Sequence, residues 1–171
     1  MSKILGSWSG MRKYLEHEML AENLHKRVRY NCTSYVGMDG CHIFEIYIDN
    51  KLIKQFSWKT VNSYFIKNEY KKISSPASIE EYWDEFWTII DAIPIQSRTE
   101  YTDNEFCEAL KSYRNQAIQC SLNSENPLEK MFAILDKRVG KKTLSNVKES
   151  FKNQPNWLKF IYNLRLNAEN I

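Results

Sequence analysis

Apolar positions alternate with polar ones in part of the first third of the chain and follow a helical spacing over most of the rest. The alternation predicts three strands, over residues 28–36, 41–48 and 51–57. The helical spacing predicts helices over residues 7–24, 58–72, 78–93, 103–122, 127–139, 143–151 and 155–168. Hairpins followed by a run of helices favour a single α+β domain over residues 1–171, in which a three-stranded, or slightly larger, antiparallel meander packs against several helices.

The turn between the second and third strands is the Asp-Asn pair at positions 49–50, two residue types that tolerate a positive φ. A two-residue turn there pairs Ile46 with Ile53, and it also sets Glu45 opposite Lys54 as a favourable charge pair. This register predicts that Phe44, Ile46 and Ile53 line the face of the sheet that packs against the helices.

The turn between the first and second strands is less regular. A two-residue turn would set Cys32 opposite Glu45, and the apolar face of one strand would then adjoin the polar face of the other. A shift of one residue corrects this mismatch, so we expect a bulge or an odd-length loop around residues 37–40.

Polar and glycine residues mark the expected helix ends. Ser78 with Glu81, and Thr102 with Glu105, have the spacing of a capping box, in which two side chains satisfy the first N–H groups of a helix. Gly140 stands where a left-handed glycine closes a helix, so it is predicted to end the helix at 127–139.

Composition places the chain among folded proteins of a reducing compartment. An apolar fraction of 43% and an aromatic fraction of 13% exclude a disordered chain. The sequence begins without a signal peptide and holds no stretch of about 20 apolar residues, so we expect a cytoplasmic protein that does not cross a membrane. The four cysteines form no CxxC pair and are expected to be buried thiols; they are Cys32, Cys41, Cys107 and Cys120.

The candidate catalytic and ligand-binding residues do not have the spacing that such sites require. The run from Gly140 to Thr143 lacks the second glycine of a phosphate-binding loop and follows a helix. His17 and His25 are eight residues apart, and the sequence has no HExxH motif and no cysteine at metal-ligand spacing. Cys41 and His42 are neighbours in a strand, so their side chains point to opposite faces. We therefore predict no catalytic residue, no metal site and no cofactor.

Charge is unevenly distributed, although the net charge is only +3. Residues 80–108 hold nine acidic residues and one basic residue, whereas residues 137–165 hold eight basic residues and one acid. Runs of like charge usually serve only as solvated helix faces.

Trp87 is the aromatic residue that we single out. It is predicted to lie about a quarter-turn from the buried centre of its helix, on the same flank as Glu80, Asp84 and Asp91. An aromatic side chain bordered by acids is a candidate contact for a basic protein partner. The alternative is that Trp87 packs beneath the preceding loop.

Three segments carry a resemblance. They are the run Ala-Ile-Leu-Asp-Lys-Arg-Val-Gly-Lys-Lys-Thr-Leu at 133–144, the ending Phe160…Leu164-Arg165…Ala168-Glu169, and the strand Arg-Val-Arg-Tyr-Asn-Cys-Thr-Ser-Tyr at 27–35. Together they make most of the chain resemble a family of small uncharacterised bacterial proteins with an N-terminal helix, a short β-meander and a helical C-terminal half. The resemblance implies this layout and a bacterial cytoplasmic setting, but it implies no activity and no site residues.

Three functions remain open. The sequence favours a non-catalytic protein-binding module, for instance an immunity-like or antitoxin-like protein that blocks a partner's active site. The first alternative is a nucleic-acid-binding protein that uses the basic C-terminal third. The second is an enzyme whose site is assembled from residues scattered along the chain.

Overall fold

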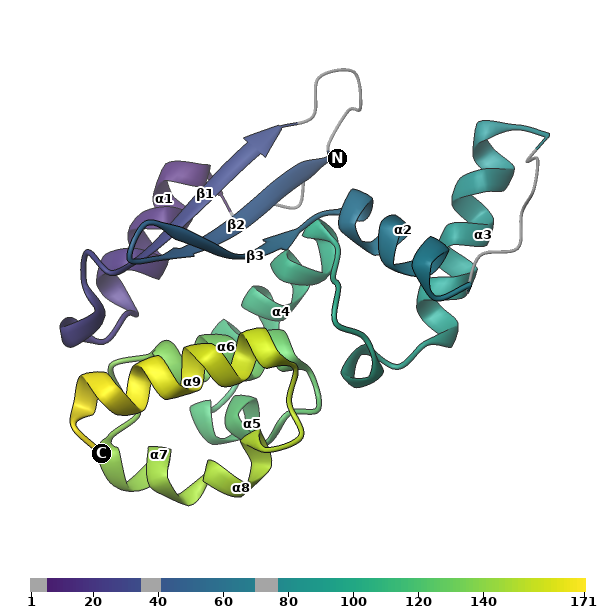
Figure 1. Cartoon of the computed structure of the whole chain (residues 1–171). Helices are drawn as coiled ribbons and strands as arrows, with labels where there is room; N and C mark the ends of the chain where they lie inside the picture. The colour runs from purple at the N-terminus through teal and green to yellow at the C-terminus, as the bar shows by residue number, and fades with distance from the viewer. Residues whose placement is uncertain (1–5, 35–40, 70–76) are drawn as a thin grey trace.

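A three-stranded antiparallel sheet and a set of helices make up an α+β fold (Figure 1). The computed structural model describes residues 6–34, 41–69 and 77–171. The sheet has the order β1-β2-β3 and consists of β1 (Val28–Ser34), β2 (His42–Ile48) and β3 (Lys51–Phe56). The helical elements of the described residues are α1 (Trp8–Lys13), η1 (Tyr14–Glu18), η2 (Glu22–Leu24), α2 (Trp58–Lys67), α3 (Ile79–Ala92), η3 (Ile95–Ser97), α4 (Asp103–Asn115), α5 (Ile118–Asn123), α6 (Pro127–Leu135), α7 (Lys141–Asn146), α8 (Lys148–Phe151) and α9 (Asn156–Glu169).

The register between β1 and β2 is the shifted one that the sequence predicts. Cys32 lies opposite Phe44, and Tyr30 lies opposite Ile46. The apolar faces of the two strands therefore coincide. The bulge or odd-length loop expected around residues 37–40 lies outside the described residues.

The predicted register between β2 and β3 is wrong beyond the turn. The two-residue turn forms with both residues at positive φ, but a β-bulge then shifts the pairing by one residue. Lys54 lies opposite Ile46 in the place predicted for Ile53, and Gln55 lies opposite Glu45 in the place predicted for Lys54.

Phe56 gives the physical reason for this bulge. Without the extra residue, Gln55 would lie opposite Phe44 on the core face; with it, Phe56 takes that position and is fully buried. The ring of Phe56 then lies 4.9 Å from that of Phe106 in α4. Ile53 is left half-buried at the edge of the core, whereas Phe44 is buried as predicted.

The main core forms where the sheet meets α1, η1, α4, α6 and α9. Phe106 stands near its centre, because its ring lies 4.8 Å from Phe44 on the sheet and 5.3 Å from Phe132 in α6. The N-terminal segment contributes Met11, Leu15 and Leu24, as the helical stripe predicts.

The helices predicted at 7–24 and 127–139 are both shorter than expected, because their ends meet. Leu20 and Asp136 form an isolated antiparallel β-bridge. Backbone hydrogen bonds of 2.9 Å from Ala21 to Leu135 and from Lys137 to Met19 flank it. The backbone at both ends is thereby paired across the molecule and not along a helix.

Two other predicted helix boundaries need correction. Gly140 has φ −85° and is the N-cap of α7, not the left-handed glycine that closes α6. The helix predicted at 103–122 divides into α4 and α5 at Gln116, whose side-chain amide donates to Ser121 and to Glu129. The rest of the helix predicted at 58–72 beyond α2 falls partly outside the described residues.

The two predicted capping boxes differ. Thr102 and Glu105 form the complete box at the start of α4. Ser78 accepts from the Glu81 N–H at the start of α3, but the Glu81 carboxylate accepts from Ala77 and not from Ser78.

A second, smaller apolar cluster joins α2 to α3 and is separate from the main core. Val61 and Phe65 of α2 pack there with Phe86 and Ile90 of α3. The two helices form an arm that projects to one side of the sheet (Figure 1).

Candidate functional site

The residues predicted to contact a partner lie on one flank of α3. Glu80, Asp84 and Asp91 are exposed, and Trp87 is 37% exposed. Their spacing of four, three and four residues keeps all of them on one strip of the helix. The side chain of Trp87 is therefore not buried in the core, and its role in binding stays a prediction.

Trp87 is anchored although it is exposed. Its ring meets that of Phe86 edge-to-face, with the centroids 5.6 Å apart and the planes at 83°. Phe86 is itself fully buried against Phe65, at 5.7 Å, inside the arm. One side of the indole is thus held in place while the rest faces solvent.

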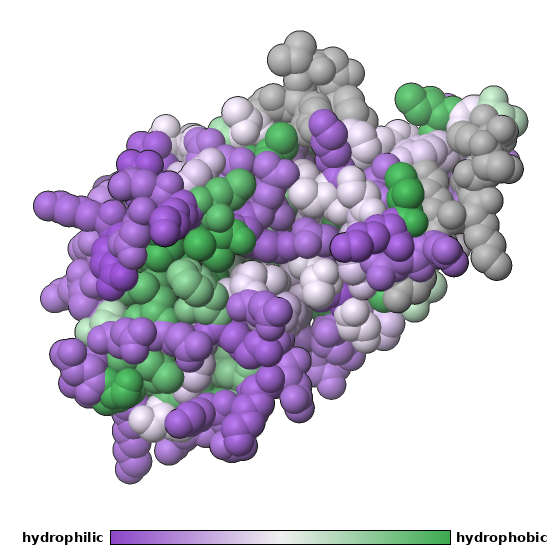
Figure 2. Space-filling model, in the orientation of Figure 1, coloured by the Kyte–Doolittle hydropathy of each residue, from purple (hydrophilic) through white to green (hydrophobic). Residues whose placement is uncertain are grey.

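Exposed apolar side chains are concentrated on the arm. Among the described residues the large exposed ones are Leu52, Ile66, Ile79, Trp87, Phe160 and Ile171. Three of these six belong to α2 and α3. Figure 2 shows isolated apolar spots on the arm, and a second apolar area over the region of β3 and α9. A short arm that shows this much apolar surface is a candidate interaction site.

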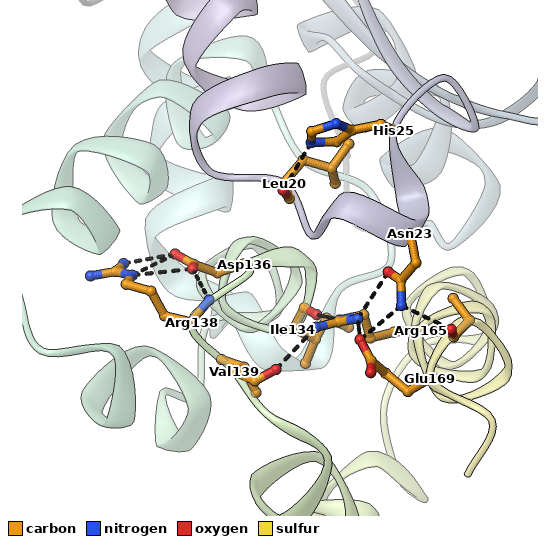
Figure 3. A network of polar contacts seen from close by, with 10 residues as sticks. Leu20, Asn23, His25, Ile134, Asp136, Arg138, Val139, Arg165 and Glu169 are labelled. Carbon is orange, nitrogen blue, oxygen red and sulfur yellow. Dashed lines mark hydrogen bonds and ion pairs between the residues drawn. The ribbon is translucent and has the colours of Figure 1, made fainter.

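The motif at 133–144 contains a turn that is held by hydrogen bonds to the buried carboxylate of Asp136 (Figure 3). Asp136 is 1% exposed and accepts from the backbone N–H of Arg138 at 2.7 Å and from its guanidinium. The hydroxyl of Tyr113 donates to the same carboxylate from α4. The carboxylate thereby fixes the turn that follows α6.

Arg165 holds the same turn from the opposite side. It is 2% exposed, and its guanidinium donates to the carbonyls of Ile134 at 3.1 Å and Val139 at 3.0 Å. It also donates to Asn23 and to Glu169 (Figure 3). The arginine therefore ties α9, the N-terminal segment and the turn after α6 together.

The protonation states suit this structural role. Burial raises the pKa of Tyr113, and the hydrogen bond to Asp136 raises it further, so the phenol keeps the proton that it donates. Hydrogen bonds to Asp136 and Tyr113 raise the pKa of Arg138 despite partial desolvation. Burial opposes ionisation of Glu169, but hydrogen bonds from Asn23 and Arg165 outweigh it and lower the pKa of that carboxyl.

Two of the three segments that carry the resemblance, residues 133–144 and 160–169, are thus joined by these hydrogen bonds. A family model matches residues 7–166, nearly the whole chain. The chain belongs to the SF0329 protein family. Membership confirms the resemblance and brings no activity with it. No curated protein and no solved structure matches the chain significantly.

The histidines and cysteines of this SF0329 family member do not assemble into a metal centre within the described ranges. His25 places Nε2 at 3.2 Å from the carbonyl of Leu20, and its ring lies 6.2 Å from that of His17. His42 donates its backbone N–H to Asp103 at 2.8 Å. The four cysteines are free thiols, but only Cys107 is buried as expected: Cys32 and Cys41 are half-buried and Cys120 is exposed.

Some of the basic residues in the C-terminal third are buried or paired with carboxylates of the same chain. Arg165 is buried, Arg138 is bound to Asp136, and Lys152 pairs with Glu149 at 2.6 Å. Four exposed lysines of this region remain over α7, α8 and the turn before them: Lys137, Lys141, Lys142 and Lys148. In the part of the chain that is described, no helix is both long and apolar enough to cross a membrane.

Proposed function

We propose that this protein is a non-catalytic protein-binding module of the cytoplasm, which docks a basic protein partner on the acidic flank of α3. The observation that carries the proposal is the exposed, anchored Trp87 among three exposed carboxylates. An immunity-like or antitoxin-like role, in which the partner is an enzyme with a basic active site, is the form that this surface suits.

Each part of the flank supplies a different share of binding. A tryptophan buries a large apolar area and loses little side-chain entropy, and Trp87 is already held against Phe86. The carboxylates of Glu80, Asp84 and Asp91 attract a cationic surface, so they speed association more than they slow dissociation. The association rate should therefore fall as salt is added, because salt screens exposed charges.

Replacing Trp87 with Ala is expected to weaken binding of the partner by about 2 kcal/mol or more. The fold should stay intact, because the side chain is partly exposed. The partner is first captured from a lysate of the native host and its pI is determined. Its affinity for wild type and variant is then measured by surface plasmon resonance at several salt concentrations.

The matched control is Phe160→Ala, which removes an aromatic side chain of comparable exposure, 49%, from α9. A basic protein retained by wild type and by the Phe160 variant, and lost with the Trp87 variant, supports the proposal. An acidic partner, or equal affinity of all three proteins, rejects it.

The nucleic-acid alternative makes its own prediction. We expect no binding to duplex DNA above the non-specific level, because Arg165 is buried and the charges of Arg138 and Lys152 are paired with carboxylates. True binding would weaken with salt with a logarithmic slope of about 0.9 per phosphate contacted. Fluorescence anisotropy at physiological salt decides: micromolar or tighter binding that is lost in a Lys141→Glu, Lys142→Glu variant would favour the alternative over protein binding.

A further inference from the structure

A polar cleft lies where the N-terminal helical segment meets the first strand, in a part of the molecule that the proposed function does not use. It has a volume of about 500 Å³, which is within the range of small-molecule sites. Its lining residues are Arg12, Glu16, Arg29, Tyr30, Asn31 and Tyr47. Walls of this kind favour a charged ligand over an apolar one, because a charged ligand needs polar partners when it leaves water.

The strands supply one wall of the cleft, on the face of the sheet that points away from the main core. Arg29 lies opposite Tyr47 across β1 and β2, and its neighbour Tyr30 is buried on the other face. A hydrogen bond to Glu45 raises the pKa of the Tyr47 phenol, and the positive charge of Arg29 opposes this effect. The guanidinium of Arg29 therefore lies near the phenol on this wall.

The N-terminal segment supplies the other wall. Arg12 belongs to α1, and Glu16 follows four residues later in η1. Since η1 is a π-helix, it is of a kind that occurs frequently at functional sites. One carboxylate oxygen of Glu16 accepts from the backbone N–H of Tyr30 at 2.7 Å, which fixes the side chain against β1. The second oxygen has no hydrogen-bond partner among the described residues, so it can accept from a ligand.

Two positive charges at the cleft have no partner within the described chain. Arg12 and Arg29 are exposed, and neither guanidinium forms an ion pair or a hydrogen bond with another described residue. Glu45 is not among the lining residues, and its carboxylate accepts at 3.0 Å from each of three side chains, those of Asn31, Tyr47 and Gln55. The walls of the cleft thus carry two guanidinium groups and one carboxylate.

We infer that this cleft binds a small dicarboxylic amino acid. Each guanidinium can hold a carboxylate with two parallel hydrogen bonds, so Arg12 and Arg29 match the two carboxylates of such a ligand. The free oxygen of Glu16 matches its ammonium group. The wall charges, two positive and one negative, are the reverse of the ligand charges, two negative and one positive.

L-Glutamate is the probe for the test, and glutarate, which is glutamate without the amino group, is the second titrant. Each is titrated into the ¹⁵N-labelled full chain at constant ionic strength. Saturable amide shifts confined to α1, η1, β1 and β2 are expected with glutamate, and glutarate should bind at least about tenfold more weakly. Arg12→Gln and Arg29→Gln should each weaken glutamate binding at least about tenfold, because each removes a charge-assisted contact.

Glu16→Gln separates the ammonium contact from the carboxylate contacts. Glutamine keeps an oxygen for the N–H of Tyr30, so the fold should be retained, and glutamate should then bind no more tightly than glutarate. This comparison also decides the matter if an arginine variant loses its fold in the same spectra.

The matched control is Lys142→Gln, which removes one exposed positive charge from α7 and should bind glutamate as wild type does. Three results would overturn the inference: no saturable shift up to about 10 mM glutamate, equal binding of the two titrants by wild type, or equal weakening in the control. None of them bears on Trp87, which lies on α3 in the arm.

Discussion

Replacing Arg165 with Met is expected to lower the free energy of unfolding by about 3–5 kcal/mol, because it removes one side of a buried charged network. The guanidinium is 2% exposed and is bonded to two backbone carbonyls and two side chains. Methionine has a similar length but donates no hydrogen bond, so the substitution tests the contacts more than the volume.

The expected loss comes from the groups left behind. The carbonyls of Ile134 and Val139 belong to buried residues, so solvent has little access to them to replace the lost donor. Glu169 would retain its charge beside them without its arginine. Lysine at position 165 should recover only part of the stability, because a single ammonium group cannot reproduce the fork of the guanidinium.

Urea unfolding followed by circular dichroism measures the change, with equal slopes in wild type and variant showing that the midpoint alone has moved. The control is Arg29→Met, which alters an exposed arginine of β1 and should change stability by no more than about 0.5 kcal/mol. If the Arg165 variant lost as little stability as the Arg29 variant, the turn after α6 would not depend on the hydrogen bonds of Arg165.

The turn after α6 also shows which features the sequence cannot predict. Periodicity predicts helices at 7–24 and 127–139, since each segment has a continuous apolar stripe. The bridge between Leu20 and Asp136 ends both of them, and a contact between residues so far apart leaves no trace in either local pattern. The family resemblance of 133–144 is visible in the sequence, but the buried hydrogen bonds that give these residues their role appear only in the structure.

The candidate flank could be predicted because it depends on one helix alone. The position of Trp87 beside Glu80, Asp84 and Asp91 follows from 3.6 residues per turn and from a buried stripe that the sequence displays. The ion pair of Lys54 with Glu100 could not be predicted in the same way. It joins residues more than forty positions apart in the sequence, and it depends on the bulge that turns Lys54 to the side of Ile46.

The bulge itself can be tested by a pair of substitutions on neighbouring strands. Ile46→Ala is expected to cost about 2–5 kcal/mol, because Ile46 is fully buried on the core face of β2. Ile53→Ala should cost clearly less, since the bulge leaves Ile53 half-buried and gives its place opposite Ile46 to Lys54. The unbulged register, which pairs the two isoleucines on the core face, predicts similar losses at both positions.

Urea unfolding of the two variants therefore distinguishes the registers without a new structure. Each change truncates an isoleucine to alanine in a β-strand, so differences in intrinsic strand propensity largely cancel in the comparison. Nearly equal losses of stability in the two variants would support the unbulged pairing. A loss below about 1 kcal/mol at Ile46 would contradict both registers, because a buried isoleucine truncated to alanine leaves a cavity that its neighbours fill only in part.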